Sequence, residues 1–227
     1  MGMSLNQDYE EELFRYAEDL ESVVREAFDN GIKMEQSMLT NRSVYDEIKK
    51  EYEILRQLND DLYYGRIVKP DVFRELLDEI LGKSNNDVYV ELYKRAYEDK
   101  WYGEIQTMLF NIAYAVAEDL DIVLPYQLKL VLKDAIRNYL LQNPGSTQYV
   151  LEKLNELKNA EEDYKFAKIL QELGVPKDVA DLLADAIWEL GSFYSVNETS
   201  SYDLDLLNES IVDAISEVEQ SVKEGNI

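Results

Sequence analysis

The stretch IQTMLFNIAYAVAEDL, residues 105–120, decides the fold class of this chain. Its apolar residues recur every three or four positions, at Ile105, Leu109, Ile112, Ala113, Val116 and Leu120. That spacing places them on one face of an α-helix, whereas a half-buried β-strand would alternate polar and apolar residues. The stretch therefore predicts a helix, and it closes the longest periodic segment of the chain, about residues 87–120.

The same helical spacing continues through most of the sequence on both sides of this stretch. Only 9 Gly and 4 Pro occur in 227 residues, and they fall between periodic segments, where helix ends are expected. The pattern predicts helices over about 5–29, 34–62, 70–81, 87–120, 125–140, 146–173, 176–190 and 202–222. An alternative breaks the second of these at residues 40–43, with Ser43 capping a new helix.

Single glycines and prolines set several of the expected boundaries. We expect Gly31 to end the first helix and Gly103 to bend the long one. We expect Pro125 to begin a helix, because proline is tolerated in the first turn but disrupts a helix interior. Residues 191–201 form the most loop-like part of the sequence.

These elements predict an all-α fold, a multihelical bundle of about seven to nine helices. Several of the helices are long and have coiled-coil-like seams. Because 46% of the residues are hydrophobic, the chain can bury a sizeable core. We expect either a single helical domain over 1–227 or two closely packed lobes, about 1–82 and 87–227.

Acidic residues outnumber basic ones by about two to one. The sequence has 47 Asp and Glu against 23 Lys and Arg, a net charge of −24, and residues 1–29 and 196–227 carry −7 each. Such a charge repels the nucleic-acid backbone and anionic membranes, so we expect no direct binding to either. A basic protein is the partner that this field attracts.

Cysteine and histidine are both absent from the sequence. Their absence excludes disulfides, thiolate nucleophiles, imidazole bases and the ligand sets of structural zinc, and we expect no cofactor or metal. The first dozen residues carry acids where a signal peptide would have bases. The apolar stretch 105–117 is shorter than the roughly 20 residues that a membrane-spanning helix needs. We therefore expect a cytoplasmic protein without a membrane anchor.

Carboxylates spaced three or four residues apart occur at several places, at Glu18/Glu21, Glu75/Asp78, Asp178/Asp181 and Asp181/Asp185. On a helix each pair projects from one side, where it can hold Mg²⁺. Each pair resembles one half of the paired Glu-x-x-Glu and Glu-x-x-Asp motifs of all-α pyrophosphohydrolases, and this resemblance implies a Mg²⁺-dependent phosphohydrolase as an alternative. Such spacings are frequent by chance in an acidic chain, so we assign no catalytic or metal-binding residue.

An aromatic strip recurs every four residues, at Tyr89, Tyr93, Tyr97 and Trp101. It lies beside the expected core face of the same helix, so the apolar arc is wider than burial on one side requires. One explanation is a central helix that packs on two sides. The other is an exposed strip that binds a partner or a second copy, because Tyr and Trp are favoured interface residues.

A basic stripe is formed by Lys129, Lys133 and Arg137, with Asp134 the nearby acid. Residues four apart share one helix face, and no other stripe of this sign occurs in the sequence. The stripe either pairs with an acidic helix of the same chain or contacts an anion or another subunit. The two stripes together supply our candidate interface residues.

The sequence favours a non-catalytic protein-protein interaction or scaffold protein that acts through helix faces. Its partner is another protein or a second copy in a homo-oligomer. Two alternatives stay open: the Mg²⁺-dependent phosphohydrolase, and an acidic inhibitor that imitates nucleic acid and occupies a basic protein. An enzyme needs carboxylates that converge in a cleft, whereas a mimic needs them exposed in rows.

Overall fold

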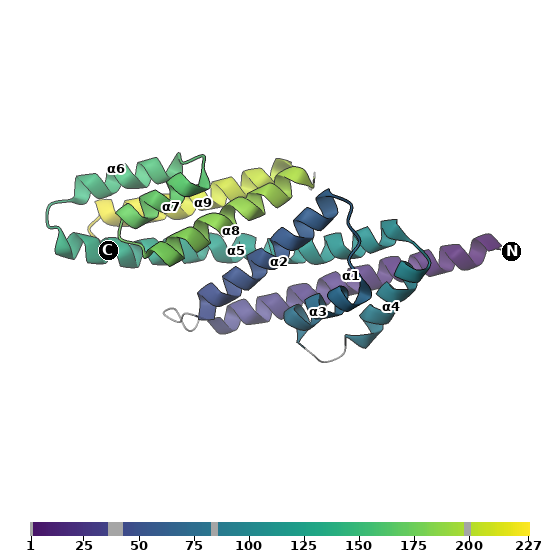
Figure 1. Ribbon diagram of the computed structural model, residues 1–227. Helices are drawn as coiled ribbons and strands as arrows, with labels where there is room; N and C mark the ends of the chain where they lie inside the picture. Colours follow the sequence, from purple (N-terminus) through teal and green to yellow (C-terminus); the bar gives the residue numbers. More distant parts are fainter. Residues whose placement is uncertain (1, 36–42, 83–85, 198–200) are drawn as a thin grey trace. The chain divides into compact units, whose positions relative to one another are not determined.

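A computed structural model describes residues 2–35, 43–82, 86–197 and 201–227 of the chain. Over these residues there are nine α-helices and no β-strand, which confirms the predicted all-α, multihelical fold (Figure 1). The helices are α1 (Gly2–Glu35), α2 (Ser43–Tyr63), α3 (Pro70–Leu81), α4 (Asp87–Glu98), α5 (Tyr102–Gln142), α6 (Thr147–Lys158), α7 (Asp163–Glu172), α8 (Lys177–Val196) and α9 (Ser201–Lys223).

The chain divides into two compact units. The first contains residues 1–41 and 53–119, and the second contains residues 42–52 and 120–227. Helices α2 and α5 each contribute residues to both units. The lobe boundary that we expected near residues 82–87 lies inside the first unit.

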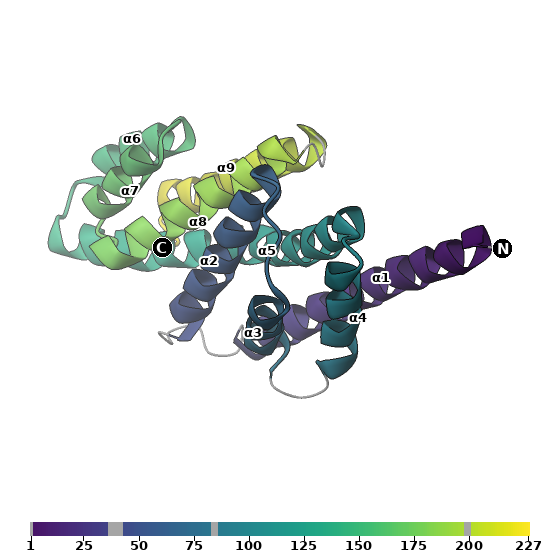
Figure 2. The same cartoon turned by 45° about the vertical axis from the view of Figure 1, so that its right-hand side comes forward.

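In the first unit, α3 and α4 pack against each other and both contact α1 (Figures 1 and 2). Residues 105–119 of the first half of α5 belong to this unit, and the periodic apolar side chains of residues 105–120 are buried as predicted. The core also takes side chains from the other helices of this unit, among them Leu13, Leu20, Leu58, Phe73, Leu77 and Tyr93. Burial of these faces is what makes the short helices α3 and α4 stable, since isolated 12-residue helices are marginal in water.

In the second unit, α7 packs on α8, α6 packs on α9, and α8 packs on α9. Figure 2 shows α8 and α9 side by side. The apolar positions of these helices meet in one core, which includes Leu128, Leu154, Leu170, Leu183, Leu190 and Ile215. Two ion pairs tie neighbouring helices together, Lys153–Glu172 at 2.9 Å and Lys158–Glu219 at 2.6 Å.

The expected long helix over residues 87–120 is broken at residues 99–101. The N–H of Lys100 donates to the Tyr97 carbonyl and the N–H of Trp101 to the Ala96 carbonyl. Lys100 has φ +59°, so this is a left-handed helix stop of the Schellman type. Glycine usually occupies that position, and its absence here explains why the sequence pattern indicates an irregularity at Gly103 instead.

The prediction that Pro125 begins a helix is wrong. Helix α5 continues through Pro125 from Tyr102 to Gln142. A proline in a helix interior costs about 3 kcal/mol, because it removes a hydrogen bond and crowds the preceding turn. Leu124 and Leu128, on either side of Pro125, are fully buried, and we infer that burial of this face outweighs the cost.

Three further boundaries differ from expectation. Helix α1 continues past Gly31, since one interior glycine costs only about 1 kcal/mol. Residues 159–162 separate α6 from α7, where the Asn159 side-chain amide donates to the Asn155 carbonyl and competes with the helical pattern. Helix α8 extends to Val196, past the expected loop start at Gly191. The alternative start of α2 at Ser43 is observed, while residues 36–42 and 83–85 lie outside the described part of the chain.

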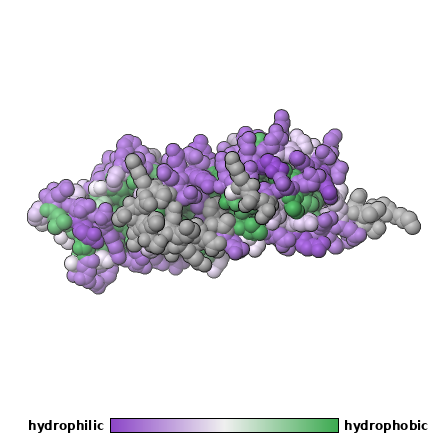
Figure 3. All heavy atoms as spheres, turned by 90° about the horizontal axis from the view of Figure 1, so that it is seen from below, coloured by the Kyte–Doolittle hydropathy of each residue, from purple (hydrophilic) through white to green (hydrophobic). Residues whose placement is uncertain are grey.

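The surface carries mostly hydrophilic side chains on the face drawn in Figure 3, with smaller hydrophobic patches between them. Several large apolar residues are exposed, including Phe14, Val23, Tyr164, Tyr202 and Val212. Across the residues that the structure covers, no helix is both long and apolar enough to cross a membrane.

Candidate functional site

The aromatic strip does not form one continuous exposed surface. Tyr93 is completely buried, its ring stacks on Phe73 with centroids 4.0 Å apart, and its hydroxyl donates to the Val68 carbonyl. Burial raises the pKa of Tyr93 further than the nearby Tyr97 and Asp61 do. Tyr93 therefore belongs to the core of the first unit, which corrects its place among the surface candidates.

The other three members of the strip are half-buried. Tyr89 and Tyr97 each leave part of the ring at the surface, and Trp101 makes an edge contact with Tyr9, with centroids 4.3 Å apart. Burial is also the first cause of the raised pKa of Tyr9. What remains of the strip is a set of separate, partly covered rings, and their role in an interface stays a prediction.

The basic stripe on α5 is partly used within the chain. Lys129 lies 3.0 Å from Glu217 of α9, and Arg137 lies 3.9 Å from Asp134 one turn away. Lys133 is half-buried and has no ion-pair partner among the residues the structure describes. The pairing of Lys129 with acidic α9 matches the intramolecular alternative for this position, and the role of Lys133 and Arg137 stays open.

The spaced carboxylates are mostly occupied in local contacts. Glu21 binds Arg25 at 2.7 Å, Asp78 accepts a hydrogen bond from Asn86 at 2.7 Å, and Asp181 binds Lys177 at 2.6 Å. Among the described residues, no three or more acidic side chains are grouped so that they could hold a metal ion. None of these pairs belongs to a group of that kind within that part of the chain.

Two of these carboxylate pairs, Asp178/Asp181 and Asp181/Asp185, do line a common hollow of the second unit. It has a volume of about 720 Å³, and α8 faces the first turns of α2 across it. Burial, followed by the charges of Asp134 and Asp178, raises the pKa of Tyr45 in its wall. Lys49 is the base in this lining, so the hollow is acidic without being a cluster of acids alone.

A groove in the first unit combines an exposed aromatic ring with an acidic rim. This α1–α5 groove has a volume of about 510 Å³ and runs between residues 7–18 of α1 and the first two turns of α5. Phe14 lines it and is 58% exposed, next to the buried Leu13. At Gly103 a Cβ would meet no atom within 4 Å, so the groove is open beside the backbone of α5.

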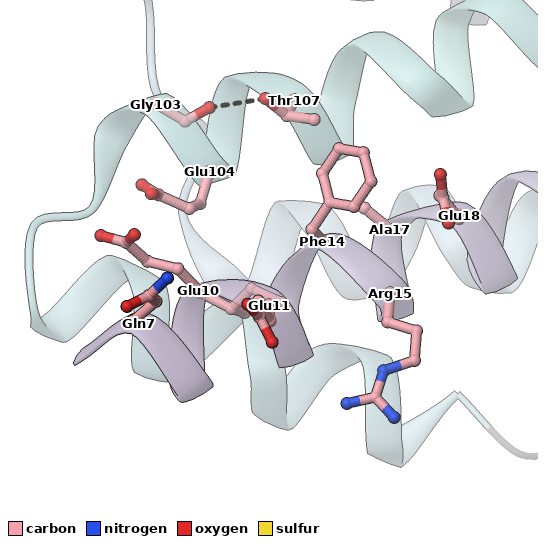
Figure 4. A pocket seen from close by; sticks show the side chains of 11 residues that line it. Gln7, Glu10, Glu11, Phe14, Arg15, Ala17, Glu18, Gly103, Glu104 and Thr107 are labelled. Atoms are coloured by element: carbon pink, nitrogen blue, oxygen red, sulfur yellow. Dashed lines mark hydrogen bonds between the residues drawn. The ribbon is translucent and has the colours of Figure 1, made fainter. Parts of the chain in front are cut away.

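Charge in the α1–α5 groove is strongly unbalanced. Figure 4 shows the Phe14 ring between the two helices, with the carboxylates of Glu10 and Glu104 near one end and Glu18 near the other. Arg15 is the single base of the lining, and its side chain points away from α5 (Figure 4). An apolar ring surrounded by carboxylates matches a ligand that carries both an apolar side chain and positive charge.

A second groove lies in the second unit, between α8, α9 and the α6–α7 connection. This α8–α9 groove has a volume of about 610 Å³. Its apolar lining includes the half-buried Trp188, whose ring lies 5.3 Å from that of Phe166, and the exposed Val212. Ser192 and Ser195 of α8 also line the groove, and both are exposed.

Both grooves depend on residues that the sequence patterns do not single out as candidates. Phe14 follows the apolar face of α1 by one position and is surrounded by acids, and a large aromatic residue outside the core stripe is the signal that could have found it. For Gly191 the pattern predicts a helix end. The continued spacing of Ile187, Leu190 and Tyr194 through it would have identified a glycine inside a helix.

The fold and the grooves define a class of protein: an all-α, strongly acidic chain with apolar grooves between its helices. In comparisons with known proteins, no family model, no curated protein and no solved structure matches this chain.

Proposed function

We propose that this chain is a non-catalytic interaction or scaffold protein whose helix faces bind basic segments of other proteins. The observation that carries the proposal is Phe14, a large apolar side chain more than half exposed in a groove whose rim has four glutamates and one arginine. Exposed aromatic residues at the centre of a polar rim are typical of protein-binding sites.

The charge of the whole chain supports the same partner class. A net charge of −24 accelerates association with basic proteins and opposes association with acidic ones. Peptide recognition by paired helices commonly uses an apolar groove with complementary charge at its edge. Under this proposal the grooves provide the contact area, and the carboxylates select a partner of positive charge.

Peptide display tests the proposal and defines the chemistry of the partner at the same time. A random peptide library is selected on the intact protein, and we expect enriched sequences that combine Lys or Arg with large apolar residues. Phe14→Ala should weaken binding of the peptides that use the α1–α5 groove at least tenfold. Val23→Ala, which truncates an exposed side chain of the same helix outside that groove, is the matched control. Enriched peptides that bind Phe14→Ala and wild type equally, with no basic preference, would contradict the proposal.

A row of exposed acids on α9 favours the nucleic-acid mimic as a second candidate. Asp205, Glu209 and Asp213 recur every four residues, so they share one helix face about 6 Å apart along the axis. A mimic would bind a basic nucleic-acid-binding protein through these charges alone. Its binding would be lost in Asp205→Asn/Glu209→Gln/Asp213→Asn and would be unaffected by Phe14→Ala.

The remaining predictions about function have direct tests. Phosphate or pyrophosphate release from nucleoside triphosphates with Mg²⁺, lost in Asp181→Asn, would support the phosphohydrolase alternative instead.

Light scattering after size exclusion, with and without Mg²⁺ and at high salt, measures whether the chain forms the predicted homo-oligomer. The cytoplasmic location stays a prediction that fluorescence microscopy of a tagged chain can test.

A further inference from the structure

The α8–α9 groove is lined by Gly191, a glycine in the interior of α8, where glycine lowers the stability of a helix. Gly191 lies inside α8, five residues before its end at Val196, and an interior glycine costs about 1 kcal/mol relative to alanine. A Cβ at this position would lie 3.7 Å from Leu204 Cδ1, an ordinary contact, so the neighbouring helix does not require glycine. A longer side chain, however, would extend into the groove. Because Gly191 has no side chain, it leaves the groove open at this point of its lining.

The edge of this groove is acidic. Glu161 is the acid of the lining. Asp205 and Glu209 lie outside the lining on α9, next in sequence to its members Leu204 and Asn208, and both are exposed without an ion-pair partner in the described residues. Lys158 is the only base in the lining, and it is held by Glu219 at 2.6 Å. A ligand that enters the groove therefore meets unneutralised negative charge along α9.

We propose that the α8–α9 groove binds a basic amphipathic α-helix of a partner protein, with an apolar residue of that helix seated over Gly191 beside Trp188. The inference rests on the proposed function for the class of partner, but it uses none of the residues of the α1–α5 groove. It adds a second binding site, in the other unit, and names the form of the ligand.

The dimensions of the groove fit a helix. Its lining spans residues 187–195 of α8 and 204–212 of α9, each about 12 Å long at 1.5 Å per residue. That length covers roughly two turns of a bound helix, enough for apolar side chains at positions i, i+3 or i+4, and i+7. Lysine or arginine on the neighbouring positions of the same helix would lie beside Asp205 and Glu209. A second copy of this chain fits poorly, because its own charge is −24.

The test uses a fluorescently labelled synthetic helix of leucine and lysine, with the leucines on one face, and measures its anisotropy on titration with the full chain. Gly191→Leu fills the groove and should weaken binding at least tenfold. The matched control Gly191→Ala adds one methyl group and should change the affinity less than threefold. If Gly191→Leu fails to fold, as judged by circular dichroism, Ser192→Arg places bulk and positive charge in the lining from an exposed position.

Further probes separate the alternatives. A peptide of the same composition with its leucines scattered should bind at least tenfold more weakly, and Asp205→Asn/Glu209→Gln should weaken the original peptide. Equal binding of the scattered peptide, or wild-type binding by Gly191→Leu and Ser192→Arg, overturns the proposal. A wild-type dimer that becomes monomeric in Gly191→Leu would assign the groove to a second copy and also overturn it.

Phe14→Ala distinguishes this inference from the proposed function. We expect the leucine–lysine helix to bind the α8–α9 groove unchanged in Phe14→Ala. Loss of binding in Phe14→Ala with retention in Gly191→Leu would leave the proposed function standing and overturn this inference.

Discussion

Replacing Tyr93 with phenylalanine and with alanine should separate the two contributions of this buried ring to stability. Tyr93→Phe keeps the stack on Phe73 but removes the hydroxyl that donates to the Val68 carbonyl. Leaving a buried acceptor without its donor costs about 1–3 kcal/mol. Tyr93→Ala also removes the ring from a fully buried site, and truncation of a buried aromatic residue costs about 3–5 kcal/mol. We therefore expect Tyr93→Ala to lower the free energy of unfolding more than Tyr93→Phe does, because the first loses both the packing and the hydrogen bond and the second loses only the hydrogen bond.

The assay is urea unfolding followed by the fluorescence of Trp101, in a Trp188→Phe background. The sequence has two tryptophans, one in each compact unit, so Trp101 alone reports on the first unit, where Tyr93 lies. Tyr89→Phe is the matched control, since that ring is only half-buried, and it should change the free energy of unfolding by less than about 0.5 kcal/mol. Losses below about 0.5 kcal/mol for both Tyr93 variants would refute the assignment of Tyr93 to the core.

The pH dependence of Tyr93 gives the same reasoning a second test. Burial raises the pKa of Tyr93 above its ordinary value of 10.0, so the folded state favours the neutral phenol. The resulting stability is fully present below pH 10 and is lost as the pH rises through the pKa of the folded state. Between about pH 10 and pH 12, the free energy of unfolding should therefore fall less steeply with pH for Tyr93→Phe than for wild type, each measured relative to its own value at pH 7.

Three other substitutions test features of the fold. Lys100→Gly should stabilise the first unit by about 1 kcal/mol in urea unfolding, because it relieves the left-handed backbone at φ +59°. Gly191→Ala should stabilise the second unit by about 1 kcal/mol through helix propensity, and destabilisation would show that Leu204 leaves no room. Hydrogen bonds from Lys158 and Lys223 lower the pKa of Glu219 below its ordinary value of 4.5. Its stabilisation is thus present above pH 4.5 and lost as the pH falls through the lower pKa, so Glu219→Gln should cost about 1–2 kcal/mol at pH 7 and less in acid.

The fold class was predictable because each helix has an apolar face that it must bury. The spacing of residues 105–120 identified the buried side of α5, and Pro70 with Gly82 fixed both ends of α3. The sequence predicted a helix boundary correctly where a proline begins a helix or a glycine ends one, and incorrectly where the same residue type lies inside a helix, as Pro125 and Gly31 do. Boundaries made by other residues were not found, as the left-handed Lys100 shows.

The candidate site was less predictable than the fold, because exposure depends on neighbours far apart in the sequence. The four-residue repeat of the aromatic strip left open whether Tyr93 is buried by a second neighbouring helix or exposed, and the stack on Phe73 shows that α3 covers it. Conversely, Phe14 adjoins an apolar face and its exposure follows only from how α5 lies beside α1. Periodicity within a helix gives the directions of its side chains but not the elements that cover them.

The charge of the chain distinguishes binding of a basic helix in a groove from self-association of two copies of the chain. With 47 acids and 23 bases, at least 24 acids have no base of their own in the chain even when every base pairs with a different acid. Salt screens charges beyond about 8 Å at physiological ionic strength, so it weakens binding to a basic helix and relieves repulsion between two acidic copies. Affinity for the leucine–lysine helix should therefore fall as salt rises from about 50 mM to 500 mM, whereas self-association should increase over the same range. If the helix binds equally well at both salt concentrations, the carboxylates at the groove edge do not select the partner, and its apolar lining alone accounts for the affinity.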